Sequence, residues 1–267
     1  MINQPFNQLC TTKYGLMLVN KNDRYIGKSL ILYGEINEAE NIFYKQVCPK
    51  GANVIEVGSN IGVHSLAISR FISPNGQLFC FEPQRVVYQT LNANLALNSI
   101  TNTFTYNKAV GDEAKEINIP KIDYTKEGNF GGFSIVNDAK GEKIPQIVLD
   151  EFMDLEHLEL LKIDVEGMEE DVIRGALSLI DTHKPIIYCE NDRQDRSQSL
   201  IELLWSLEYK CYWHLPALFS EENFNSVKEN IFKNLVSVNM FCVHKESEIN
   251  VTGFIEVDDS SYHPMKR

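Results

Sequence analysis

The sequence of 267 residues has few of the features that mark secreted or membrane-spanning proteins. Its six cysteines lie far apart and form no Cys-x-x-Cys pair, so we expect free thiols in a reducing compartment rather than a disulfide framework. The N-terminus carries no apolar signal core, and no run approaches the roughly 20 apolar residues of a membrane span. These absences predict a soluble protein of the cytoplasm.

Positive charge is also scarce. The chain has 25 Lys and Arg against 37 Asp and Glu, for a net charge of −12, and its basic residues are not clustered. Binding to a nucleic-acid backbone depends on clustered positive charge. We therefore expect no nucleic-acid partner. The sequence contains no internal repeat and no low-complexity tract that would indicate a solenoid or a disordered region.

From residue 50 onward, short apolar runs alternate with segments of helical periodicity. Seven runs have the character of buried strands: 53–57, 77–81, 104–110, 160–165, 185–190, 210–215 and 238–243. Helical patterns separate many of them, at 84–98, 168–180 and 197–207. Aliphatic strands that alternate with helices predict a parallel sheet covered on both faces. The expected fold class is α/β, with a Rossmann-like, doubly wound, mostly parallel sheet of seven strands.

Three regions lie outside this alternation. Residues 1–49 look like short strands followed by a helix near 38–47, and we expect them to form an N-terminal extension packed on the core. The core domain is expected at 50–245, with a polar, glycine-containing insertion at 111–147. Residues 246–267 are expected to form a C-terminal tail that frays at its end.

The first core strand ends in the pattern Glu-x-Gly-x-Asn-x-Gly, formed by Glu56, Gly58, Asn60 and Gly62. Glycines allow the backbone to turn sharply and to approach a ligand closely. A nicotinamide dinucleotide fingerprint would have glycine at Asn60 and would place the pyrophosphate on the helix N-terminus. Asn60 crowds that phosphate position, and Glu56 would repel an anion but suits an ammonium group. The alternative is a glycine turn that binds no ligand.

Two further strand ends offer contacts for a nucleoside. Glu82 follows the second strand, 24 residues beyond Gly58, and a carboxylate there can accept both hydroxyls of a ribose. It could also be an acid favoured by a helix N-terminus. Ala109 and Val110 end the third strand and would lie along an adenine, unless the strand simply leaves the sheet there. Together these positions predict adenosine without a pyrophosphate, attached to a cationic group, and S-adenosylmethionine fits that description.

Carboxylates also follow the fourth and fifth strands, at Asp164, Glu166 and Glu190. Paired carboxylates repel each other, so they usually have a cation, a metal ion or a proton to share. Lys162 could be that cation, because strand alternation places it on the same face as Asp164. The alternative is that Asp164 caps the following helix and Glu166 begins it.

Several segments resemble the FkbM family of S-adenosylmethionine-dependent methyltransferases: VIEVGSNIGVHSLAIS, FEP, KAVGD, NFGG and above all LLKIDVEGMEEDVIRGA. The resemblance covers roughly residues 50–243 and makes 50–245 the expected methyltransferase domain. It implies a Rossmann-like methyltransferase fold and O-methylation of a hydroxyl on a sugar, glycan or related natural product. Glu56 and Ser59 depart mildly from the family pattern, whereas Asn60 matches it.

A hydroxyl acceptor near neutral pH needs a general base or a metal ion. The catalytic candidates are Asp164, Glu166, Glu190 and His214, and Asp164 is also a candidate for cofactor binding. Oxygen ligands at the ends of the fourth and fifth strands would suit Mg²⁺, as in catechol-type methyltransferases. FkbM-like proteins are not generally metal enzymes, so the resemblance favours metal-independent transfer and assigns no metal ligand.

Two other functions stay open from the sequence. A nicotinamide-dependent oxidoreductase or epimerase would need a glycine at position 60 and usually a Tyr-x-x-x-Lys pair, which the sequence lacks. A non-catalytic binding protein could keep the fold, although the intact glycine turn and Glu82 argue against a degenerate site. The insertion is expected to lie over a pocket for a small-molecule or glycan acceptor, and the N-terminal extension could support a homo-oligomer.

Overall fold

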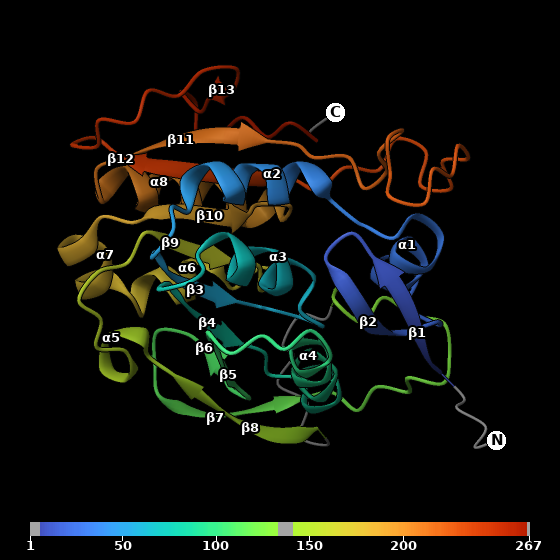
Figure 1. Cartoon of the computed structure of the whole chain (residues 1–267). Coiled ribbons are helices and arrows are strands. Elements are labelled where there is room, and N and C mark those ends of the chain that lie inside the picture. The colour runs from blue at the N-terminus through green and yellow to red at the C-terminus, as the bar shows by residue number, and fades with distance from the viewer. Residues whose placement is uncertain (1–5, 133–140, 266–267) are drawn as a thin grey trace.

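The computed structural model describes residues 6–132 and 141–265. Within them, one sheet of eight strands runs in the order β13-β11-β12-β10-β9-β3-β4-β5 (Figure 1). In chain order these strands are β3 (Asn53–Val57), β4 (Gln77–Phe81), β5 (Thr103–Tyr106), β9 (Leu160–Ile163), β10 (Ile186–Glu190), β11 (Tyr209–His214), β12 (Asn239–His244) and β13 (Ile255–Glu256).

The expectation of an α/β sheet is confirmed, but the sheet is mixed and has one strand more than expected. Strands β5, β4, β3, β9 and β10 are parallel, whereas β12 is antiparallel to both β10 and β11, and β13 is antiparallel to β11. The apolar pattern of β12 indicates that the strand is buried, but it does not indicate whether the strand is parallel or antiparallel to its neighbours. The two residues of β13 are both exposed and too few to show a pattern.

The expected third strand is divided. β5 ends at Tyr106, and Ala109–Val110 forms β6 in a separate three-stranded sheet with β7 (Lys115–Ile119) and β8 (Glu142–Ile147). Asn107 lies at the break, where its side-chain amide donates to the backbone oxygens of Glu82 and Pro83 at 2.9 and 3.0 Å. The chain therefore leaves the large sheet two residues before Ala109, and the prediction of one continuous strand over 104–110 is wrong.

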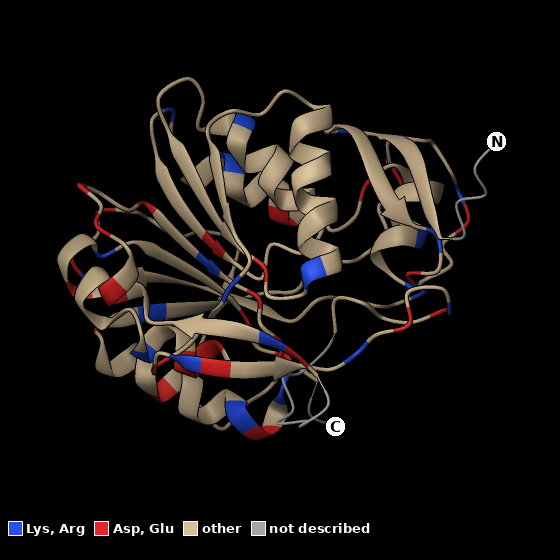
Figure 2. Ribbon diagram, turned by 90° about the horizontal axis from the view of Figure 1, so that it is seen from below, with Lys and Arg blue, Asp and Glu red and all other residues tan. Residues whose placement is uncertain are grey.

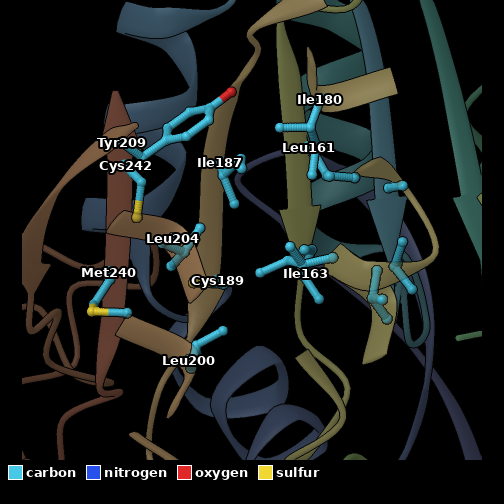
Figure 3. Close-up of a cluster of buried hydrophobic side chains, with 14 of the residues drawn as sticks. Leu161, Ile163, Ile180, Ile187, Cys189, Leu200, Leu204, Tyr209, Met240 and Cys242 are labelled. Carbon is cyan, nitrogen blue, oxygen red and sulfur yellow. The ribbon is translucent and has the colours of Figure 1, made fainter. Parts of the chain in front are cut away.

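Helices cover both faces of the large sheet. One face carries α2 (Glu38–Val47), α3 (Val63–Phe71) and α4 (Arg85–Leu97), and the other carries α5 (Leu149–Phe152), α6 (Glu169–Arg174), α7 (Leu177–His183) and α8 (Gln194–Ser206). Because side chains alternate along a strand, neighbouring residues enter different cores. Leu161 and Ile187 pack with Ile180 and Leu204 on one side, as Figure 3 shows, whereas Leu160 joins the core on the other side.

The N-terminal extension comprises an antiparallel hairpin, β1 (Asn7–Thr12) and β2 (Gly15–Asn20), followed by α1 (Ile26–Tyr33) and α2. The hairpin is attached to α4 through Asn94, whose side chain accepts from the backbone N–H of Leu18 at 2.6 Å and donates to the backbone oxygen of the same residue at 3.1 Å. In Figure 1 the hairpin and α1 lie on the side toward which β3 points. The extension therefore borders the carboxyl ends of the central strands.

The insertion and the tail also pack on the core. Residues 120–132 lead from β7 back to the N-terminal extension, where the backbone N–H of Arg24 donates to the oxygen of Gly128 at 2.8 Å. The remaining part of the insertion before Gly141 lies outside the described residues. In the tail, His263 is buried and its Nε2 lies 2.8 Å from the backbone oxygen of Asn191, so this part of the tail packs on the core.

None of the helices in the described part of the chain is both long and apolar enough to cross a bilayer. All six cysteines are free, and five of them are buried. Figure 2 shows Lys and Arg interspersed with Asp and Glu over the described elements rather than gathered along one of them.

Candidate active site

Two cavities adjoin at the carboxyl ends of the parallel strands, where ligands of such sheets bind. The larger has a volume of about 420 Å³ and lies between the strand ends, the N-terminal extension and the segment before β12. The smaller, of about 50 Å³, lies beside the ends of β4 and β6. Five residues line both cavities: Gly58, Glu82, Gly131, Asp164 and Glu166.

The turn after β3 requires the residues that occupy it. Gly58 has φ +84°, and a Cβ there would lie 1.8 Å from the backbone oxygen of Asp164, so only glycine permits this approach of β3 to the end of β9. Asn60 also has a positive φ, of 49°, a conformation that asparagine adopts more readily than most residues. Gly62, with φ +87°, precedes the first turn of α3.

Glu82 hydrogen-bonds to the turn after β3. Its side chain is buried, with Oε2 accepting from the backbone N–H of Asn60 at 3.0 Å and Oε1 from that of Gln84 at 2.8 Å. Burial raises the pKa of Glu82 to about 7, although the two N–H donors oppose the rise. Ala109 and Val110 line the smaller cavity together with Glu82. The three residues expected to contact adenosine therefore surround one cavity.

Glu56 lines the larger cavity but already has an ammonium partner in the chain itself. Lys162 is buried, and its Nζ lies 3.5 Å from Glu56 Oε1 and 3.5 Å from Asp164 Oδ2. Ser65 Oγ donates to Glu56 Oε2 at 2.5 Å. Burial would lower the pKa of Lys162, but Asp164 and Glu56 raise it, so the lysine stays charged. Any contact of Glu56 with a ligand ammonium is shared with Lys162.

Asp164, Glu166 and Glu190 converge at the ends of β9 and β10, with one oxygen of each lying within 4.8 Å of the others. Burial and the neighbouring carboxylate Asp164 raise the pKa of both Glu166 and Glu190. Arg193 Nη2 lies 2.6 Å from Glu166 Oε2, whereas Glu190 Oε2 is buried without a hydrogen-bond partner among the described residues. The cluster is chemically suited to take up a proton or to contact a cation.

His214 is the one catalytic candidate that lies apart from the cavities. It is on β11, its Nδ1 lies 2.9 Å from the hydroxyl of Tyr188, and its ring packs against Phe43 and Phe254. Burial lowers its pKa to about 4, and it is absent from the described lining of either cavity. The structure brings Asp164, Glu166 and Glu190 together but does not bring His214 to them.

Much of the larger cavity comes from residues that the sequence did not single out. Arg193 comes from the turn after β10. The remaining walls are contributed by the N-terminal extension and by the segment between β11 and β12, through Tyr25, Ile26, Ile36, Asn37, Leu218, Leu235, Val236, Ser237 and Val238. Neither segment carries a periodic pattern or a motif that marks it as part of a site.

The insertion reaches the cavities through its glycine-rich part. Asn129, Gly131 and Gly132 line the larger cavity, and Gly131 also lines the smaller one. Phe130 is buried, and its backbone oxygen accepts from Gln84 Nε2 at 2.9 Å. This part of the insertion thus borders both cavities rather than the larger one alone.

A glycine turn after one strand, a carboxylate after the next and a cavity at the carboxyl ends are the features with which doubly wound α/β enzymes bind nucleoside-containing cofactors. Comparison with known families gives the particular class. Residues 56–211, more than half of the chain, match the family model described as the methyltransferase FkbM domain, and the protein belongs to this family of methyltransferases. The resemblance noted from the sequence motifs is confirmed.

Two curated relatives are described as methyltransferases. The chain is 27% identical over 204 residues to methyltransferase sdnD of Sordaria araneosa, an alignment that covers 60% of this chain and 78% of that protein. It is 25% identical over 160 residues to methyltransferase 1 of Beauveria bassiana, covering 52% and 63%. The solved structure of PH0793 from Pyrococcus horikoshii has a TM-score of 0.52 at 10% identity, covering 91% and 74%, and shares the fold.

Proposed function

We propose that the protein transfers a methyl group from S-adenosylmethionine to a hydroxyl of a sugar, a glycan or a related natural product. The observation that carries this proposal is the position of Glu82. It lies on the wall shared by the two cavities, and backbone N–H groups of Asn60 and Gln84 fix both of its oxygens. Each oxygen keeps a second lone pair for a ribose hydroxyl.

The charge between the two cavities favours this cofactor over a dinucleotide. The five residues that line both cavities are two glycines and three carboxylates, with no cation among them in the described chain. The three carboxylates outnumber the two cations that pair with Asp164 and Glu166, so a pyrophosphate at this junction would meet net negative charge, whereas a sulfonium is attracted to it. Ala109 and Val110 leave an apolar wall for adenine in the smaller cavity. The residues present therefore fit S-adenosylmethionine.

When bound, S-adenosylmethionine supplies a methyl group on a positively charged sulfur, and the chain supplies position and a proton acceptor. Asp164 and Glu166 lie at the junction of the cavities and contribute negative charge there. Glu190 lies in the larger cavity, and one of its oxygens is unpartnered among the described residues. We therefore propose that Glu190 accepts the proton of the acceptor hydroxyl. Because its pKa is raised, the ionised form of Glu190 is a stronger base than an ordinary carboxylate.

Glu166 is the second candidate for this proton, but its ion pair with Arg193 disfavours protonation. Lys162 and Arg193 already place positive charge against Asp164 and Glu166. This pairing reduces the need of the cluster for a metal ion. We therefore propose metal-independent transfer.

Calorimetry tests the cofactor. We expect S-adenosylhomocysteine to bind the protein and NAD not to bind. Turnover of S-adenosylmethionine carrying a labelled methyl group, measured against a panel of hydroxylated glycosides, tests the reaction. Binding of NAD in place of S-adenosylhomocysteine would indicate an oxidoreductase, and binding of S-adenosylhomocysteine without methylation of any glycoside would contradict the assigned acceptor class.

A further inference from the structure

A third, wider depression of about 750 Å³ lies on the surface beside the larger cavity. We call it the basic groove; its lining residues are Gln8, Lys21, Arg24, Tyr25, Lys28, Ile31, Leu32, Ile231, Phe232 and Leu235. Tyr25 and Leu235 line both the basic groove and the larger cavity. The basic groove and the larger cavity therefore adjoin at these two side chains.

The basic groove and the cavity carry opposite charges. The described lining of the groove contains three cations and no carboxylate. The lining of the larger cavity contains six carboxylates and two cations, one Lys and one Arg. The groove is therefore a positively charged surface on a chain whose net charge is −12. An anionic group is repelled from the cavity and attracted to the groove, which orients any ligand that spans them.

The charge of the groove matches a phosphate. Glu127 pairs with two of the cations, at 3.5 Å from Arg24 Nε and 3.1 Å from Lys28 Nζ, so three positive charges face one negative charge at its rim. The surplus of two positive charges matches a phosphate monoester, which carries about −1.5 to −2 at neutral pH, and more than balances a phosphate diester, which keeps a single ionised oxygen. The side chains of Arg24 and Lys28 are 56% and 41% exposed, which leaves their remaining donors accessible.

The groove is also apolar. Leu32, Ile231 and Leu235 are 38%, 40% and 41% exposed and lie among its lining residues. An exposed apolar surface of this kind, rimmed by charge, is typical of a binding groove rather than of ordinary solvent-facing surface. Its combination with the cations fits a ligand that has both an apolar chain and an anionic group.

We propose that the acceptor is an amphiphile in which a hydroxylated head group is joined to an apolar chain through a phosphate. The head group lies in the larger cavity beside Glu190, the phosphate contacts Arg24, Lys28 and Lys21, and the chain covers Leu32, Ile231 and Leu235. This proposal rests on the proposed methyl transfer and narrows its acceptor class.

Calorimetry on the full chain tests the groove with three probes: decyl phosphate, inorganic phosphate and octyl glucoside, each below its micellar concentration where it has one. We expect decyl phosphate to bind at least tenfold more tightly than either of the others, since it alone satisfies both the cations and the apolar residues. Equal affinity for inorganic phosphate, or for octyl glucoside, would overturn the proposal.

The double variant Arg24→Gln/Lys28→Gln should bind decyl phosphate at least fivefold more weakly than the wild type does. The matched control is Lys115→Gln/Lys143→Gln, which removes two cations that are also paired with glutamates but lie on the β7–β8 hairpin. It should leave the affinity unchanged, and an equal loss in the control would contradict a local site. The variant Ile231→Ser should bind decyl phosphate more weakly than the wild type does, whereas its affinity for inorganic phosphate should be unchanged.

S-adenosylhomocysteine binding separates this proposal from the function on which it rests. It should be the same in wild type and in all three groove and control variants. If S-adenosylhomocysteine binds but decyl phosphate is not preferred, the acceptor proposal fails and the cofactor proposal stands. If S-adenosylhomocysteine does not bind the wild type, the proposed function fails.

Discussion

At the scale of single residues, the site depends on positions where the backbone and a carboxylate fix each other. Asn60 adopts a positive φ and donates its N–H to Glu82, so the residue that excludes a dinucleotide fingerprint also shapes the turn. Both residues could be predicted from the sequence because motif spacing encodes them. The pairing of Glu56 with Lys162 depended on the register between β3 and β9, in which these two residues lie opposite each other, and spacing alone does not give that register.

Replacing Glu82 tests the most specific contact of the proposed cofactor site. In Glu82→Gln, an amide N–H₂ replaces a carboxylate oxygen that would accept from a ribose hydroxyl, so a hydrogen bond to a charged group worth about 1.5–3 kcal/mol is lost. We expect the affinity for S-adenosylhomocysteine, measured by calorimetry, to fall roughly tenfold to a hundredfold. The exposed control Glu142→Gln should bind as the wild type does. Unchanged affinity in a folded Glu82→Gln would contradict the ribose assignment.

Glu190 makes stability depend on pH in a direction that can be worked out. Burial and Asp164 raise its pKa, so the folded protein retains a proton that the unfolded chain releases above the ordinary carboxyl value of 4.5. The wild type therefore loses stability as pH rises above that value. Glu190→Gln should remove this loss and raise the free energy of unfolding at pH 8 by about 1 kcal/mol, or the melting temperature by roughly 2–4 °C.

The melting temperature should rise much less at pH 5, where Glu190 remains protonated in the folded protein. Thermal unfolding at the two pH values measures the difference. Glu248→Gln changes an exposed carboxylate in the tail and should show no pH-dependent gain. A gain of equal size at both pH values in Glu190→Gln would show that repacking, and not the charge, causes it.

At the scale of elements, strand ends were easier to predict than strand partners. The ends of β9 and β10 carry the expected carboxylates because residue types after a strand are visible in the sequence. The sequence left open whether the strand leaves the sheet at Ala109 and Val110, because the chain leaves where the side-chain amide of Asn107 bonds to the backbone after β4, and no motif predicts that contact. The antiparallel direction of β12 could not be predicted either, because a run of apolar residues is compatible with a parallel or an antiparallel strand.

The carboxylate ends of β9 and β10 lead to a prediction for metal removal. Lys162 lies 3.5 Å from Asp164, and Arg193 lies 2.6 Å from Glu166, so two of the three carboxylates already face a cation. Methyl transfer should therefore be unchanged after treatment with EDTA and gel filtration. Loss of turnover that Mg²⁺ restores would contradict this and would assign the cluster to a metal ion. S-adenosylhomocysteine binding before and after treatment controls for damage to the protein.

At the scale of the whole molecule, the sequence could predict the layered α/β fold but not the completed cavity. Strand and helix periodicity lies within short segments and can be read locally. The larger cavity joins Tyr25 and Ile36 to Leu218 and Val238, which are about two hundred residues away along the chain. No local sequence pattern predicts that these segments meet, so this side of the larger cavity is seen only in the folded chain.

The cysteines provide a test of the fold as a whole, because their burial depends on both cores. Five are buried, and burial raises the pKa of the sixth, Cys10, to about 11. Since the thiolate is the reactive form, only about one Cys10 in a thousand is reactive at pH 8. Native protein should therefore react slowly with Ellman's reagent at Cys10 and much more slowly elsewhere, and Cys10→Ser should abolish the slow phase.

Unfolding in guanidinium without reductant should expose all six thiols together, at the same denaturant concentration at which helical circular dichroism is lost. Dithiothreitol should leave the melting temperature unchanged, because no thiol is paired in the structure. Recovery of only four thiols in denaturant would indicate a disulfide and contradict the fold as described. Cys48 and Cys80 belong to the core on one face of the sheet, and the other three buried cysteines, Cys189, Cys211 and Cys242, belong to the core on the opposite face. Exposure of the first two thiols before the other three would show that the two cores unfold separately.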